Sequence, residues 1–246
     1  MTKAAAGEAP VICVDGPSGA GKGTLAQSLA DTLGWHLLDS GALYRVVGLA
    51  CLSGGVPLDQ ARQVAVVARS LDVTFQPGAE GVSVWLSGAD VTREIRSEEG
   101  GISASTVAAL PEVRAALLLR RRELARLPGL VADGRDMGTV VFPSADLKIF
   151  LTASAEARAE RRYHQLQGRG ESVSLPRLLA AIIERDARDE SRSASPLVPA
   201  DDAVVLDSTA LSAGEVLGRV CELVSAREIM GEASEKRLDS AEASRQ

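Results

Sequence analysis

The sequence predicts an α/β protein built on a parallel β-sheet with helices on both faces. Two observations lead to this expectation. Short apolar segments alternate with helical segments along the chain, which is the pattern of parallel strands joined by helices. The first apolar segment, residues 11–15, also runs into a glycine-rich turn and then into a helical segment. A strand, a turn and a helix in this order form the first unit of such a sheet.

The glycine-rich turn has the pattern of a phosphate-binding loop, or P-loop. It consists of Gly16, Pro17, Ser18, Gly19, Ala20, Gly21, Lys22, Gly23 and Thr24. The glycines let backbone N–H groups face a triphosphate, the next helix offers its positive N-terminus, and Lys22 reaches the β- and γ-phosphates. We therefore predict a P-loop NTPase fold that binds ATP. The usual pattern has Ser or Thr directly after the lysine, so the delayed hydroxyl of Thr24 favours small-molecule kinases over generic ATPases.

The elements that follow the loop are expected from hydrophobic periodicity. The first are a helix at about 22–33, a strand at 35–38 and a helix at about 42–53. The pattern of predicted elements then changes. A helix near 58–71 is followed by two short strands, at 73–76 and 82–86, each with turn residues beside it. These strands predict a small inserted α+β domain over residues 57–96. Insertions at the carboxyl ends of parallel strands usually cover ligand sites.

Core elements resume after the insertion. Apolar strands that end in polar residues and amphipathic helices with start signals such as Pro111 and Ser212 are expected there. In chain order these are helices 97–109 and 111–126, strands 130–133 and 147–151, helices 155–167 and 175–189, strand 204–207 and helix 212–227. The kinase core then comprises residues 11–56 and 97–228, with a short lid at about 155–172. Residues 1–10 form a flexible N-terminus, and the polar segment 229–246 is expected to be a frayed tail without a catalytic role.

Composition excludes several classes of function. The chain has 246 residues, 46% of them hydrophobic and only 3% aromatic, with a net charge of −6. Few aromatic platforms and a negative charge argue against a nucleic-acid partner. Three separated cysteines in apolar segments and two histidines make no metal-site pattern. The chain shows no secretory leader and no membrane-spanning run, so we expect a cytoplasmic protein without a membrane partner, working as a monomer.

Two polar clusters follow predicted strands on the sheet edge that carries the P-loop. Ser40 and Arg45 come after strand 35–38, where Ser40 is expected to cap the next helix and Arg45 to donate to a phosphate. Asp133, Arg135 and Asp136 come at the end of strand 130–133 in a glycine-flanked turn. NTPases place a magnesium-assisting carboxylate at the Asp133 position. Taken alone, the first cluster is also consistent with a capping serine and a solvated arginine.

Two further clusters lie on the predicted helices of the second half. Arg185, Asp189 and Arg192 have the spacing i, i+4, i+7 and so share one helical face, whereas neighbouring charges such as Asp186 are expected to be solvated pairs. Arginines 158, 161 and 162 could close over a transferring phosphoryl group or simply form a wet face. Three adjacent arginines, 120–122, point in different directions and are given no site role.

With these clusters placed, the chain resembles the bacterial cytidylate kinase family. The resemblance runs from Val11 to about Leu223 and rests on four segments in order: DGPSGAGKGT at 15–24, LDSGALYR at 38–45, ADGRDMGTVVFP at 132–143 and RDARD at 185–189. It implies an enzyme that phosphorylates CMP and dCMP with ATP and Mg²⁺, through a monophosphate-binding domain at 57–96. The resemblance also implies which residues touch CMP. Ser40, Arg45, Arg135, Arg185 and Arg192 would hold its α-phosphate, Asp189 its ribose, and Ser105, Arg114 and Asp136 its cytosine, with Tyr44 in the same site.

The expected chemistry needs charge neutralisation more than a base, because the attacking phosphate oxygen is already anionic. The catalytic residues are then Lys22, Arg135, Arg185, Arg161 and Arg158. The metal is expected on the ATP phosphates without direct protein ligands, with Asp133 assisting through water. Two alternatives stay open: another small kinase of the uridylate/cytidylate or shikimate type, and an ATP-dependent switch whose insertion contacts a protein.

Overall fold

The computed structural model describes residues 9–78, 81–168, 170–192 and 194–229, together with Ser234, Arg237 and Leu238. The chain forms two compact units. The first comprises Met1–Leu38 and Leu124–Gln246, and the second comprises Asp39–Glu123. The expectations for residues 1–8, for position 169 of the lid and for most of the tail lie outside the described residues.

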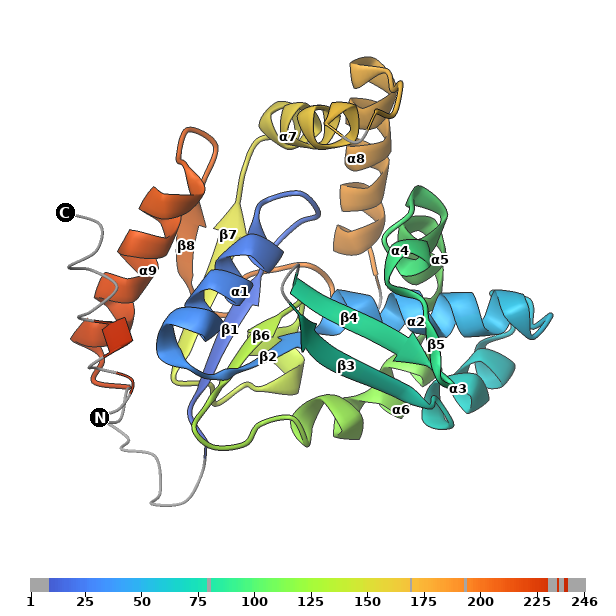
Figure 1. Ribbon diagram of the computed structural model, residues 1–246, viewed down its shortest axis with the longest axis horizontal. Helices are drawn as coiled ribbons and strands as arrows, with labels where there is room; N and C mark the ends of the chain where they lie inside the picture. The colour runs from blue at the N-terminus through green and yellow to red at the C-terminus, as the bar shows by residue number, and fades with distance from the viewer. Residues whose placement is uncertain are drawn as a thin grey trace. The chain divides into compact units, whose positions relative to one another are not determined.

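The first unit is built on the predicted parallel sheet. Its strand order is β2 (His36–Asp39), β6 (Leu130–Asp133), β1 (Val11–Asp15), β7 (Leu147–Thr152) and β8 (Val204–Asp207). The ladders β1/β6, β1/β7 and β7/β8 are parallel (Figure 1). The strand before the glycine loop is therefore central, and its carboxyl end has the carboxyl ends of β6 and β7 beside it. This arrangement confirms the P-loop NTPase fold.

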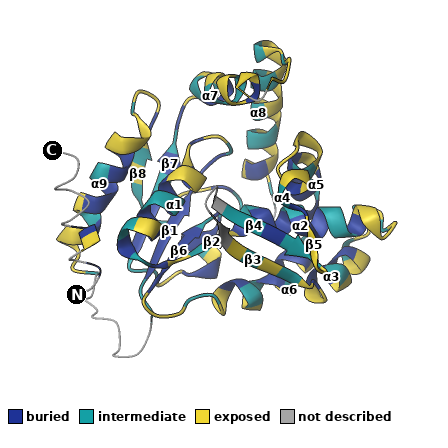
Figure 2. Ribbon diagram, in the orientation of Figure 1, coloured by how far each residue is buried: buried dark blue, intermediate teal, exposed yellow. Residues whose placement is uncertain are grey.

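Helices α1 (Lys22–Leu33) and α9 (Ala213–Ala226) share one apolar core with the sheet. Buried side chains such as Ile12, Leu29 and Val220 are fully enclosed in it, and Figure 2 shows burial concentrated on the strands and on the inner sides of these helices. Helix α9 begins with the predicted capping box, in which Ser212 and Glu215 exchange side-chain and backbone hydrogen bonds. Helices α7 (Ala155–Gln167) and α8 (Leu175–Glu190) pack on each other in the same unit.

Two residues of the expected tail, Ser234 and Leu238, are anchored rather than frayed. Ser234 accepts a hydrogen bond from Trp35 Nε1 at 3.1 Å and donates one to the Leu33 carbonyl at 3.0 Å. Leu238 is 2% exposed and belongs to the core. The expectation of a frayed tail is wrong for these residues, because the tail contributes a buried leucine and a buried hydroxyl that the polar composition around them conceals.

The second unit contains the range 57–96 and extends beyond it. An antiparallel sheet of β3 (Val73–Gly78), β4 (Gly81–Leu86) and β5 (Ala89–Asp90) confirms the predicted hairpin and adds a third strand. The helices of the unit are α2 (Ser40–Ser53), α3 (Ala61–Arg69), α4 (Thr92–Ile95), α5 (Glu98–Ala108) and α6 (Pro111–Arg122). Helices that the sequence assigned to the core thus belong to this unit by their contacts, and Pro111 begins α6 as predicted.

Candidate functional site

The glycine loop leaves β1 through a backbone that only glycine tolerates. Gly16 has φ 145°, and a Cβ on it would lie 2.0 Å from the carbonyl oxygen of Leu151. Gly21 precedes α1 with a left-handed backbone, at φ 96°. Because glycine has no side chain, no side-chain oxygen caps the amides at the start of α1 in this described segment. The first amides of α1 therefore stay available for an anion, which the dipole of the helix also favours.

Lys22 lies at the start of α1 and is only 6% exposed. Its Nζ donates to the carbonyl oxygen of Pro17 at 2.8 Å, within the loop. Burial, together with the positive charges of Arg135 and Arg185, lowers the pKa of Lys22 to about 8, and Asp133 is the main opposing charge. Three cations are thus close enough to repel one another. A polyanion placed among them would relieve this repulsion.

Asp133 stands beside the loop at the end of β6. Its Oδ2 lies 3.4 Å from the point where Gly23 would carry a Cβ. A side chain directly after the lysine would therefore lie in van der Waals contact with this carboxylate. Among the described residues no group of three or more His, Cys, Asp or Glu is placed to hold a metal ion. A carboxylate and the hydroxyl of Thr24 near the loop fit a cation that the nucleotide phosphates bring with them.

Of the predicted cluster of Arg185, Asp189 and Arg192, the last two form an ion pair, and Arg135 is a second partner of Asp189. Arg135 Nε lies 2.7 Å from Asp189 Oδ2, and Arg192 Nη2 lies 2.7 Å from Asp189 Oδ1. Helix α8 ends at Glu190, so Arg192 reaches Asp189 from the turn after the helix and not from the predicted i+7 position on it. Burial would raise the pKa of Asp189, but Arg135 and Arg192, with Arg185, outweigh burial and hold it below its ordinary value.

Two of the three lid arginines, Arg158 and Arg161, are held by hydrogen bonds within the protein. Arg158 is 4% exposed, and its guanidinium donates to the carbonyl oxygens of Ala153 and Ser18 and to both carboxylate oxygens of Asp186. The expectation that Asp186 forms only a solvated pair is therefore wrong. Arg161 donates to the hydroxyl and carbonyl oxygens of Ser208. Arg162 makes an exposed hydrogen bond to Gln165 and so fits the wet-face interpretation.

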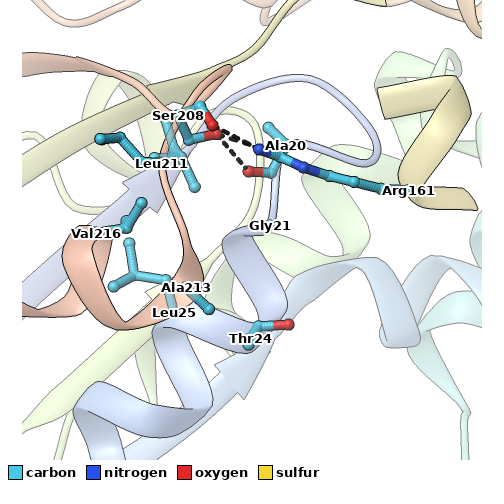
Figure 3. A pocket seen from close by; sticks show the side chains of 10 residues that line it. Ala20, Gly21, Thr24, Leu25, Arg161, Ser208, Leu211, Ala213 and Val216 are labelled. Atoms are coloured by element: carbon cyan, nitrogen blue, oxygen red, sulfur yellow. Dashed lines mark hydrogen bonds between the residues drawn. The ribbon is translucent and has the colours of Figure 1, made fainter. Parts of the chain in front are cut away.

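A cavity of about 170 Å³ opens beside the glycine loop (Figure 3). It lies under Arg161 and is lined largely by apolar side chains: Ala20, Gly21, Thr24, Leu25, Leu151, Arg161, Ser208, Leu211, Ala213 and Val216. Ser208 connects the walls, because its Oγ accepts from Arg161 and lies 3.1 Å from the Ala20 carbonyl oxygen and 3.0 Å from that of Thr152, which share its single proton. An apolar slot with a cation above it suits a flat heteroaromatic ring.

The second unit holds five of the predicted residues: Ser40, Tyr44, Arg45, Ser105 and Arg114. Asp39 caps α2 by accepting from the Ala42 amide at 2.9 Å, so the prediction that Ser40 caps this helix is wrong; Ser40 is instead its first residue and is 2% exposed. Arg45 donates to the carbonyl oxygens of Ile95 and Ser97.

The base-reading residues predicted in this unit lie in a buried region. Arg114 is 6% exposed, and its guanidinium lies 5.8 Å from the centre of the Tyr44 ring. Ser105 is 9% exposed. Arg121 approaches the same ring at 5.7 Å and donates to main-chain carbonyl oxygens of its own helix, which is consistent with a structural role.

Comparison with known proteins decides the family. The family model described as cytidylate kinase matches residues 12–226. The chain belongs to the cytidylate kinase family. A cytidylate kinase of Aeromonas hydrophila subsp. hydrophila is 58% identical over 92% of this chain and 97% of its own length. A cytidylate kinase of Shewanella frigidimarina is 59% identical over 87% of this chain and 95% of its own length.

Sequence reasoning missed two functional candidates in this cytidylate kinase family member. The first candidate is the pair Ser208 and Leu211, which line the cavity and follow β8 without any sequence motif. Their position just after a strand of the sheet was the signal that could have found them. Asp15 ends β1 as a buried carboxylate, and a charged residue closing an apolar strand was the signal available for it. In the described part of the chain no single helix is long and apolar enough to cross a membrane, and α5 with α6 pass that test only together, across a 100° bend.

Proposed function

We propose that this protein transfers the γ-phosphoryl group of ATP to CMP and dCMP, giving CDP and dCDP. The observation that carries the proposal is that Asp189 holds Arg135 and Arg192 at 2.7 Å each, while Lys22 is buried in the glycine loop and the charges of Arg135 and Arg185 help to lower its pKa. Lys22 belongs to the loop that would hold the donor, whereas Arg135 and Arg185 belong to the acceptor set. A phosphoryl group passing between two nucleotides supplies the negative charge that such a cluster lacks.

ATP is proposed to lie with its triphosphate in the glycine loop and its adenine in the neighbouring cavity. All residues of the loop, 16–24, would contact the nucleotide, mainly through backbone amides. Arg161 covers the cavity that these residues border, and would stack on the base or contact the phosphates. Mg²⁺ would enter with ATP and neutralise phosphate charge, and Asp133 is the carboxylate that would assist its binding through water.

The CMP phosphate is proposed to bind cationic and hydroxyl side chains. These are Ser40, Arg45, Arg135, Arg185 and Arg192. Asp189 would accept from a ribose hydroxyl while it aligns Arg135 and Arg192, to which it is bonded at 2.7 Å on each side. A carboxylate that fixes two guanidinium groups in this way reduces the entropy lost when a phosphate binds.

Cytosine recognition is assigned to Asp136, Ser105 and Arg114, with Tyr44 beside the arginine. Asp136 is 2% exposed and can accept from the exocyclic amine of cytosine. Uracil carries a carbonyl oxygen in place of that amine, so the same carboxylate would face an acceptor without a proton between them. A buried site of this kind rejects the wrong base by orders of magnitude.

Catalysis follows from positioning and charge. The attacking oxygen of CMP is already anionic, so no general base is required. Lys22, Arg135 and Arg185 would stabilise the charge on the transferring group, and Arg158 would add to it from beside Ser18 of the loop. Mg²⁺ supplies further neutralisation when bound with ATP.

A panel of acceptors tests the proposal. With ATP and Mg²⁺, CMP and dCMP are expected to be phosphorylated with kcat/KM at least about 100-fold above UMP, AMP or shikimate. Equal use of UMP would overturn the cytosine assignment, and efficient use of shikimate would overturn the monophosphate site itself. We also propose that the protein works as a monomer in the cytoplasm, which light scattering of the purified protein and fractionation of the source cells would test.

A further inference from the structure

The carboxylate of Asp15 lies buried at the end of β1, one residue before the glycine loop. It is 6% exposed, and each of its oxygens accepts a backbone hydrogen bond: Oδ1 from the Met137 amide at 2.9 Å and Oδ2 from the Gly138 amide at 2.8 Å. Burial raises the pKa of Asp15 to about 6, although the two backbone hydrogen bonds oppose the rise. A buried charge is costly to keep, so its partners indicate what it is for.

Both partners lie in the loop that follows β6. The loop is tied to β1 at its start as well, because the Gly134 amide donates to the carbonyl oxygen of Val14 at 3.0 Å. The loop ends where the π-helical turn Met137–Val141 begins. The first amides of a helix have no carbonyl acceptor within that helix. Asp15 satisfies two of them. The segment 134–138 is therefore fixed at both ends by consecutive residues of β1.

This segment carries Arg135 and Asp136. The Met137 amide belongs to the peptide plane directly after Asp136, so its bond to Asp15 sets the backbone orientation at Asp136. The same bond limits how Arg135 reaches Asp189, to which it lies at 2.7 Å.

We propose that Asp15 is a positioning residue for the acceptor nucleotide: its carboxylate holds loop 134–138 in the geometry that lets Asp136 select cytosine and Arg135 hold the phosphate. This inference rests on the proposed function of the same loop. Asp15 touches no substrate. It acts through two backbone amides, and it joins the acceptor loop to the strand that carries the donor loop.

Replacement of the carboxylate by an amide tests the proposal with little change of volume. In Asp15→Asn, one oxygen becomes an NH₂ group that opposes a backbone N–H, so one of the two amides loses its acceptor. We expect KM for CMP to rise about tenfold or more, and the preference for CMP over UMP to fall by a similar factor. The dissociation constant of ATP, measured without CMP, is expected to change less than about threefold, because the glycine loop keeps its own contacts.

Asp146→Asn is the matched control. Asp146 Oδ2 also accepts from a backbone amide of β1, that of Val11 at 2.8 Å, but at the opposite end of the strand. A general loss of strand stability would therefore appear in both variants, whereas loss of acceptor positioning would appear only in Asp15→Asn. Unchanged KM for CMP and unchanged base preference in Asp15→Asn, or equal losses in the two variants, would overturn the proposal.

A measurement on the unaltered protein covers the case in which Asp15→Asn does not fold. The Met137 and Gly138 amides are expected to exchange with deuterium slowly before any CMP is added, since Asp15 holds them in advance. Exchange as fast as in a free peptide would overturn the proposal. The proposed function fails separately: it fails if the unaltered protein does not prefer CMP, whatever the variants do.

Discussion

The guanidinium of Arg158 is held by the carboxylate of Asp186 through two hydrogen bonds, at 3.1 Å and 2.6 Å. The two side chains are 5% and 16% exposed, and they join α7 to α8. Arg158 also donates to the Ser18 carbonyl oxygen of the glycine loop. Helix α8 carries Arg185 and Asp189, so this ion pair connects the donor loop with residues proposed for the acceptor.

Breaking this ion pair is expected to be costly for stability. Asp186→Asn should lower the free energy of unfolding by about 3 kcal/mol, because it leaves a buried guanidinium without its charge partner. Glu184→Gln is the control on the same helix: it breaks a 3.7 Å pair with Arg188 whose side chains are 74% and 45% exposed, and should cost less than about 0.5 kcal/mol. Urea denaturation measures both. If both variants lost a similar free energy of unfolding, the buried pair would stabilise the protein no more than the exposed pair does.

Lys22 is expected to take up a proton when ATP binds in alkaline solution. With a pKa of about 8 in the empty site, this lysine is largely neutral at pH 8.5, and the phosphates of ATP raise its pKa again. Binding at pH 8.5 should therefore consume roughly three-quarters of a proton. Calorimetry in buffers of different ionisation enthalpy measures the uptake.

Lys22→Arg provides the comparison, because arginine stays charged at this pH. Its binding of ATP should show almost no proton uptake. The proton uptake should also depend on pH. Below about pH 7 the lysine is already charged before ATP binds, so the uptake should vanish in both proteins. Uptake of the same size in the arginine variant would assign the proton to another group.

Asp136→Asn is expected to lower kcat/KM for CMP by about two powers of ten. The variant loses the carboxylate that would accept from the cytosine amine, in a position that is 2% exposed and so without water to replace it. Steady-state kinetics with CMP and UMP side by side give the measurement. Retention of full activity and of the preference for CMP would remove Asp136 from the cytosine site.

Ala213→Phe is expected to fill the cavity beside the glycine loop. The added ring should raise KM for ATP about tenfold or more while KM for CMP stays within about twofold, because only the donor base loses its space. Gly214→Phe adds a larger group at the next position, where a Cβ meets nothing within 4 Å, and it should leave both constants unchanged. An effect of Ala213→Phe on KM for CMP alone would contradict the assignment of the cavity to adenine.

Local patterns sufficed to predict much of the fold. The glycine loop, the buried strands 130–133 and 147–151 and the capping box of α9 depend on residues near one another in sequence, and all of these are confirmed. The boundary of the second unit was less accessible, because α2, α5 and α6 have the periodicity of core helices, and only their packing assigns them to Asp39–Glu123.

The site was predictable as a set of residues and less so as a set of contacts. Spacing placed Arg185 and Asp189 on one helical face, but it did not show that the helix ends before Arg192 or that Asp186 pairs with Arg158, 28 residues away. Asp15 meets amides that lie 122 and 123 positions further along the chain. Periodicity indicates which side of an element is buried, but it does not identify the group, distant in sequence, that packs against that side.

The central place of β1 has a consequence for how such a protein can be altered. The strand delivers the glycine loop at its end, and its last two residues hold the segment that presents Arg135 and Asp136. The two halves of the reaction are therefore not separable modules. An attempt to redirect base preference by exchanging the loop after β6 would have to bring backbone amides that the Asp15 carboxylate still fits, or else move the donor loop along with the acceptor loop.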